Sequence, residues 1–129
     1  MTKQPSVVEH GLLRRITTSD DELEAAQLCQ AAAESGATRI DSCLRGQLIE
    51  LYGRLRSVQH IPSWGSLSSP TVEAELFDGS GSVTLVWLGR AVILGIMAGR
   101  QLRVRGRVAM REGRRVMYNP NYALEASGS

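Results

Sequence analysis

Alternation of apolar and polar residues from Gln47 onward limits the possible folds more than any other feature of this sequence. Apolar residues recur at every second position in LIELYGRLRSV, TVEAELF, SVTLVWL, QLRVRGRVAM and RVMYNPNYAL. A period of two puts neighbouring side chains on opposite faces of a β-strand, whereas a helix needs a period near 3.6. Turn-forming segments such as DGSG and REGR separate these stretches. The pattern therefore predicts a mainly β domain of five strands.

The first predicted strand contains Gly53, and a glycine inside a strand indicates a bulge or a sharp bend. A long, bent first strand followed by four more strands predicts a partly open five-stranded Greek-key barrel. The segment GRAVILGIMAG between strands three and four is interrupted by glycines, so it predicts a short helix of one or two turns. This connection is longer than the competing SH3-like barrel accommodates.

A helix is predicted before the barrel. Ser19 and Glu22 form a capping-box pattern in TTSDDELEA, and Gly36 is a typical helix stop. The apolar face of the helix consists of small residues, which suit packing either on the barrel or on a partner. The expected organisation is a loosely ordered segment at 1–18, a helix at 19–36, a barrel at 47–124 and a disordered tail at 125–129.

Composition is that of an ordinary globular domain. The 129 residues are 43% hydrophobic and 22% charged, with a formal net charge of +2. The longest apolar run, AVILGIMAG, is much shorter than the ~20 residues that a membrane helix needs. The stretch MTKQPSVVEHGLLRR has no apolar segment of signal-peptide length. We therefore expect a cytoplasmic protein that does not contact membranes.

Motifs for catalysis and metal binding are missing from the sequence. Cys29 and Cys43 do not have the spacing of a zinc site, and both histidines lie far from them. The sequence contains neither a P-loop nor a GxSxG nucleophile motif. We expect no enzymatic activity, no cofactor and no metal.

Arginine is concentrated in one segment of the chain. Residues 100–115 contain seven arginines and one glutamate, and every basic residue except Lys3 is an arginine. A guanidinium group binds phosphate in a bidentate manner, which an ammonium group cannot do. A GC-rich genome explains the scarcity of lysine equally well, so the preference for arginine alone does not identify a ligand.

Three stretches together resemble the oligonucleotide/oligosaccharide-binding (OB) fold: GRLRSV, ELFDGSGSVTLVWLGR and GIMAGRQLRVRGRVAMREGRRVMYNPNYAL. The resemblance covers roughly residues 47–124. It is greatest to the bacterial nucleic-acid-binding group that includes anticodon-binding and helicase-wedge domains. The helix before the barrel is similar to small single-domain actinobacterial OB proteins. The resemblance implies nucleic-acid binding, although the same fold also serves protein binding and oligomerisation.

In an OB barrel the first strand pairs with the second and the fourth, which predicts a shared arginine face. The expected phosphate-binding residues on this face are Arg54, Arg56, Arg103, Arg105 and Arg107. Glu73 and Glu75 face outward on the second strand, and the alternative to phosphate binding is that they neutralise Arg54 and Arg56 in cross-strand ion pairs.

Two loops are expected to frame the binding groove. The loop between the last two strands carries Arg111, Arg114 and Arg115, which we predict to contact phosphates. The loop between the first two strands carries Trp64, which can either stack on a base or fold back over the barrel. Tyr52 is a second stacking candidate.

The sequence thus predicts a module that binds single-stranded DNA or RNA with low sequence specificity. The alternative is a protein-interaction or oligomerisation module, with the N-terminal helix as the contact.

Overall fold

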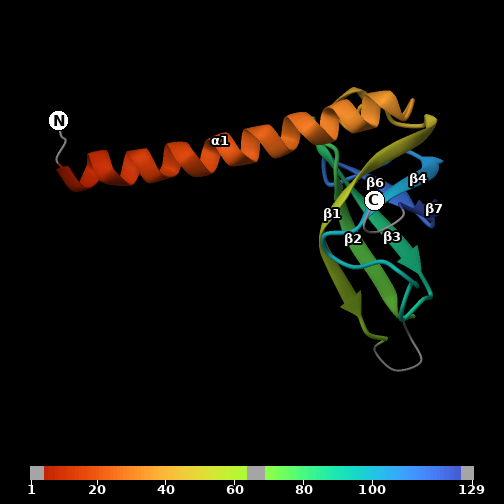
Figure 1. The fold of residues 1–129 in the computed structure, drawn as a ribbon. Helices are drawn as coiled ribbons and strands as arrows, with labels where there is room; N and C mark the ends of the chain where they lie inside the picture. Colours follow the sequence, from red (N-terminus) through yellow and green to blue (C-terminus); the bar gives the residue numbers. More distant parts are fainter. Residues whose placement is uncertain (1–4, 64–68, 126–129) are drawn as a thin grey trace.

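The computed structural model describes residues 5–63 and 69–125, with side chains from residue 20 onward. Figure 1 shows a long N-terminal helix that projects away from a curved sheet. The elements are α1 (Pro5–Glu34), η1 (Ile40–Ser42), β1 (Leu48–Ile61), β2 (Thr71–Phe77), β3 (Ser82–Leu88), β4 (Gln101–Arg107), β5 (Ala109–Arg111), β6 (Arg114–Tyr118) and β7 (Asn121–Leu124). The prediction of a mainly β fold with an N-terminal helix is confirmed.

The strands form one sheet in the order β5-β6-β3-β2-β1-β4-β7. Neighbouring strands are antiparallel except β3 and β6, which are parallel. The expected pairing of the first strand with both β2 and β4 is confirmed. No ladder joins β5 to β7 within the described strands, so the sheet does not close. The structure therefore has seven strands in an unclosed sheet, where five strands in a partly open barrel were predicted.

Two interruptions turn five predicted strands into seven. Val108 separates β4 from β5 because its N–H donates to the Gln47 carbonyl and its own carbonyl accepts from the Gly46 N–H. Beyond β6 the chain turns at Asn119, whose φ is 52°, and continues through Pro120 into β7. Proline cannot donate a ladder hydrogen bond, so it suits this break. β7 then pairs with β4.

The connection between β3 and β4 has no helix, in contrast to the prediction. Residues 89–100 form separate turns, in which Ile96 N–H donates to Ile93 O and Arg100 N–H donates to Met97 O. Gly89, Gly95 and Gly99 each have a positive φ, which ends a helical turn before a second one can follow.

The helix is longer than predicted. α1 begins at Pro5, so Ser19 lies inside it and is not an N-cap. Proline fits the first turn of a helix, where its missing N–H has no intrahelical acceptor. The predicted stop at Gly36 is confirmed by its φ of 82° and by a hydrogen bond from Ala37 N–H to Ala32 O, as in a Schellman motif.

β1 pairs with both β4 and β2. Gly53 lets the strand bend where its pairing passes from β4 to β2. A Cβ on Gly53 would lie 2.5 Å from the Phe77 carbonyl oxygen, so only glycine allows this approach. The bulge is three residues further on, between Leu55 and Ser57. The predicted bend is thus realised as a close contact at Gly53 and a bulge at Arg56.

The core fills the concave side of the sheet, as the alternation predicts. Eight residues predicted to face inward are buried: Leu51, Leu55, Val72, Ala74, Leu76, Leu102, Val104 and Val108. Ile40 of η1 covers the core at the β2–β3 turn, where its N–H donates to the Asp78 carboxylate. Ile93 and Ile96 cover it beyond the other end of β3. Met110, also predicted to face inward, is exposed because it follows the break at Val108.

The C-terminal part of α1 packs on the convex side of β1. Leu28 and Ala32 are buried at this contact, and Tyr52, predicted to face outward into solvent, is 6% exposed. Burial also raises the pKa of the Tyr52 hydroxyl. This arrangement removes Tyr52 from the possible stacking surfaces.

We expect Leu28→Ala to lower the free energy of unfolding by about 2 kcal/mol, because it leaves a cavity between α1 and the sheet. Leu23→Ala is the matched control, since Leu23 is 58% exposed on the same helix. Urea unfolding followed by far-ultraviolet circular dichroism measures both. Equal midpoints for the two variants would show that α1 does not stabilise the sheet.

Candidate functional site

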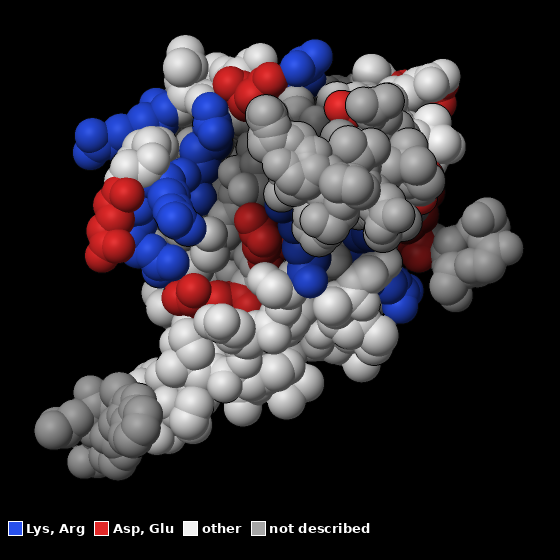
Figure 2. All heavy atoms as spheres, turned by 90° about the vertical axis from the view of Figure 1, so that its left-hand side faces the viewer, with Lys and Arg blue, Asp and Glu red and all other residues white. Residues whose placement is uncertain are grey.

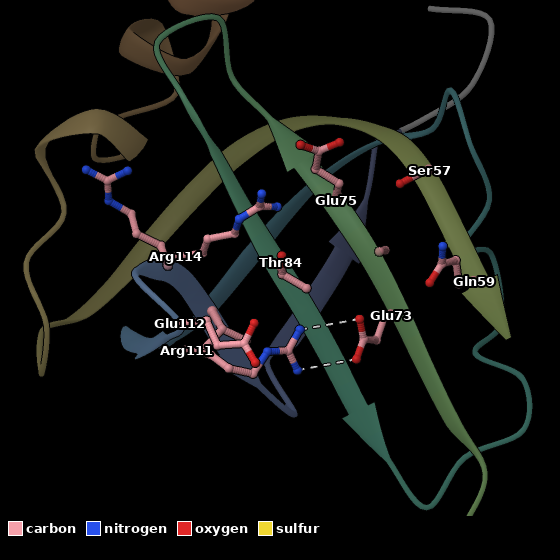
Figure 3. Close-up of a pocket in the computed structure, with 11 residues that line it drawn as sticks. Ser57, Gln59, Glu73, Glu75, Thr84, Arg111, Glu112 and Arg114 are labelled. Atoms are coloured by element: carbon pink, nitrogen blue, oxygen red, sulfur yellow. Dashed lines mark hydrogen bonds and ion pairs between the residues drawn. The ribbon is translucent and has the colours of Figure 1, made fainter. Parts of the chain in front are cut away.

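A groove crosses the convex face of β1, β2 and β3 and is bordered by the β5–β6 hairpin (Figure 3). Its volume is about 500 Å³. A second hollow of about 550 Å³ adjoins it on the side of residues 43–45. The two hollows share Glu75, Thr84, Arg114 and Arg115, so they form one continuous surface.

The floor of the groove consists of polar side chains in cross-strand rows. Ser57, Glu75 and Thr84 are paired across β1, β2 and β3, and Gln59 is paired with Glu73 in the next row. Residues directly opposite in antiparallel strands point to the same face. Since Val72, Ala74 and Leu76 occupy the core, the alternating residues of β2 must lie on this outer face.

The rim of the groove carries the three hairpin arginines, Arg111, Arg114 and Arg115. The turn between them has Glu112 and Gly113 at φ values of 52° and 77°. Positive φ at both central residues is typical of a type I′ turn, whose twist matches that of the flanking strands. The tight turn keeps the three arginines close together on the rim. All three arginines, which were predicted to contact phosphates, line this groove.

Arg111 spans the groove to reach Glu73, and its two terminal nitrogens lie 3.3 and 3.4 Å from the carboxylate oxygens (Figure 3). This hydrogen-bonded ion pair raises the pKa of Arg111. The Arg111 side chain is 41% exposed, and exposed pairs of this kind contribute only about 0–1 kcal/mol. A phosphate can therefore displace Glu73 at small cost. Glu73 thus pairs with an arginine of the hairpin, whereas the alternative would pair it with Arg54 or Arg56 of β1.

Arg115 joins the rim to the segment before β1. Its guanidinium donates to the carbonyl oxygens of Asp41 and Cys43, at 3.2 and 3.5 Å. Carbonyl acceptors orient the side chain without neutralising its charge. Burial raises the pKa of the Cys43 thiol, so this neighbour is uncharged at neutral pH.

Arg45 was not among the predicted site residues, yet it lines the same surface as Arg114 and Arg115. It is exposed and precedes β1, more than 60 residues from the hairpin in sequence. Within the described part of the chain, neither Arg45 nor Arg114 has an acidic partner within ion-pair distance. No local sequence pattern relates Arg45 to the hairpin, because only the fold brings the two segments together.

Two of the arginines that were predicted to bind phosphate instead form contacts near α1. Arg54 forms an ion pair with Glu24 of the helix. Arg103 donates to Glu50 at 3.1 Å and to the Ser35 carbonyl at 3.3 Å, where the helix ends. Both arginines hold the helix against the sheet. The five strand arginines that were predicted to form one basic face are therefore separated, because two of them are bound at α1.

The remaining strand arginines lie apart from the groove. The guanidinium of Arg56 is 3.5 Å from the Phe77 ring centroid, in a hollow that the helix acids Asp21, Glu22 and Glu24 also line. Arg107 donates to the Gly46 carbonyl at 2.6 Å, and Arg105 is exposed opposite Glu50. Trp64 lies outside the described residues.

The floor and the rim of the groove carry opposite charges. Acidic side chains lie on the floor and arginines on the rim, and Arg45, Arg114 and Arg115 face a single acid, Glu75, in the second hollow. Figure 2 shows basic side chains gathered on one side of the molecule, with acidic side chains at the edges of the group. Such an arrangement can hold an anionic chain along the rim and neutral polar groups on the floor.

Comparison with known proteins gives a likeness in fold only. No family model and no curated protein matches the chain. Among solved structures, a chain in "Structure of RecG bound to three-way DNA junction" matches with a TM-score of 0.57 and 20% identity. The match covers 70% of this chain and 13% of that chain. The chain thus shares a fold with a small part of a protein that was solved bound to DNA.

Neither α1 nor η1, as far as the structure describes them, has the length and apolar character of a membrane span. Across residues 20–63 and 69–125, no three His, Cys, Asp or Glu side chains converge in a way that could hold a metal ion.

Proposed function

We propose that this chain is an OB-type module that binds single-stranded nucleic acid with low sequence specificity. The observation that carries the proposal is the convergence of Arg45, Arg114 and Arg115 on the second hollow, which adjoins the groove over β2 and β3. OB folds bind oligonucleotides on the face of their second and third strands and on the adjoining loops. If β4 and β5 are counted as one strand interrupted at Val108, the order of the first five strands fits that fold, with β7 added.

The role proposed for the arginines is contact with phosphates. Each contact releases counterions from the nucleic acid, which gives affinity without reading sequence. Arg111 becomes a fourth contact when a phosphate displaces Glu73. The likeness to part of a DNA-bound protein supports a nucleic-acid ligand in general.

A single strand suits this groove better than a duplex. Its polar floor lies behind the arginine rim. Because phosphates bind at the rim, other groups of the nucleic acid must reach the floor. The bases of a single strand can turn toward the floor while its phosphates stay on the rim. In a duplex the Watson–Crick edges are already paired with each other, so they cannot turn toward the floor.

Fluorescence anisotropy with a labelled single strand of about 12 nucleotides, titrated at several salt concentrations, tests the proposal. Three phosphate contacts predict a slope of log K against log salt near −2, since each contributes about −0.7 on a single strand. A duplex of the same length should bind more weakly. Quenching of tryptophan fluorescence on binding would support stacking by Trp64.

Absence of binding at low salt would contradict the proposal and favour the alternative, a protein-interaction module. The observation that favours that alternative is a set of exposed apolar side chains on the β3–β4 connection. Val92, Leu94 and Met97 are 68%, 83% and 56% exposed.

A further inference from the structure

The groove separates two kinds of hydrogen-bonding group. Its rim donates, through guanidinium groups, and its floor accepts, through the carboxylates of Glu73 and Glu75 (Figure 3). We propose that nucleobases lie on this floor and that Glu75 selects bases with an exocyclic amino group over thymine and uracil. This inference rests on the proposed nucleic-acid binding and adds a preference for base composition to it.

Phosphates are excluded from the floor by charge. Glu75 lines both hollows, and no described arginine or lysine lies within ion-pair distance of it. A phosphate beside this carboxylate would be repelled, whereas one on the rim meets Arg114 and Arg115. The backbone of a bound strand must then follow the rim, and its bases are the groups that can reach the floor.

The groove has room for this arrangement. Its volume of about 500 Å³ lies within the range of sites that hold small molecules, so a base with its sugar can enter. Ser57 and Thr84 flank Glu75 in the same cross-strand row. Their hydroxyls either donate or accept, so they tolerate any base and do not select.

An ionised carboxylate accepts hydrogen bonds and donates none. Cytosine offers the two hydrogens of its N4 amino group, which is the usual partner of a glutamate that reads a base. Thymine and uracil present a carbonyl oxygen at the corresponding position, and that oxygen faces the carboxylate as a second acceptor. Glu73 is a weaker reader than Glu75 because both of its oxygens already accept from Arg111.

The test compares oligo(dC) and oligo(dT) strands of about 12 nucleotides, equal in length and charge, by anisotropy at slightly alkaline pH. For the unaltered chain we expect oligo(dC) to bind about fivefold more tightly, near the lower end of what one base contact contributes. Glu75→Gln should bring the two affinities within about twofold, because an amide both donates to a carbonyl and accepts from an amino group.

Glu112→Gln is the matched control. Glu112 lines the same groove but lies on the exposed hairpin turn and is not part of the cross-strand rows that form the floor. Removing its charge should tighten both complexes equally and leave their ratio unchanged. A purely structural role for Glu75 would likewise alter both affinities together, so the ratio of the two distinguishes reading from folding.

Equal binding of oligo(dC) and oligo(dT) by the unaltered chain overturns this inference and leaves the proposed function standing. An unchanged ratio in Glu75→Gln also overturns it. If neither strand binds at low salt, the proposed function fails, and this inference fails with it.

Discussion

Replacing Arg45 and Arg114 together with alanine should weaken single-strand binding about sixtyfold at low salt, which corresponds to about 2.5 kcal/mol for two charge-assisted hydrogen bonds. Both side chains are exposed on the groove, and neither has an acidic partner among the described residues. The slope of log K against log salt should become about 1.4 units less negative, since two phosphate contacts are lost.

Arg39→Ala combined with Arg90→Ala is the control for net charge. Arg39 is paired with Asp41, and Arg90 lies on the β3–β4 connection, so neither lines the groove. This variant removes the same formal charge and should keep the original slope. If both double variants lose affinity equally, binding depends on overall charge and the groove is not the site.

Asp78→Ala should lower the free energy of unfolding by about 3 kcal/mol, because it leaves buried donors without an acceptor. The Asp78 side chain is 1% exposed. One carboxylate oxygen accepts from Ile40 N–H at 2.9 Å, and the other accepts from the Ser80 hydroxyl and from the N–H groups of Ser80 and Gly81. These bonds shape the β2–β3 turn and attach η1 to it.

The midpoint of urea unfolding is expected to fall by about 1.5 M for this variant, for a slope near 2 kcal/mol per molar. Asp78→Asn should lose less, because its amide oxygen still accepts on one side. Asp41→Ala is the control, since Asp41 is exposed and lies in η1. A midpoint for Asp78→Ala equal to that of Asp41→Ala would show that the turn folds without the carboxylate.

The arginine face predicted from the strands was only partly correct, and the reason is electrostatic. The alternation placed Arg54 and Arg103 on the outer face, where they are found, but their partners are Glu24 and Glu50. A strand pattern gives the direction of a side chain and contains no information on which distant charge will approach it. The hairpin arginines were located better because a tight turn fixes their mutual positions locally.

What the sequence by itself determined is the set of local features. The period of two specified which residues of β2 and β4 are buried, and Gly36 specified the end of the helix. These features depend on neighbouring residues alone, because burial alternates along a strand and a helix ends where an αL residue is favourable.

Only the tertiary structure decided the features that join distant segments. Val108 breaks a regular alternation because residues 46 and 47 take its hydrogen bonds. Tyr52 is buried on the face of β1 that contacts α1, and Arg45 lines the second hollow because the start of β1 lies beside the hairpin. Each outcome is set by a contact between residues far apart in the chain. A local sequence pattern contains no information on the free energy of such a contact.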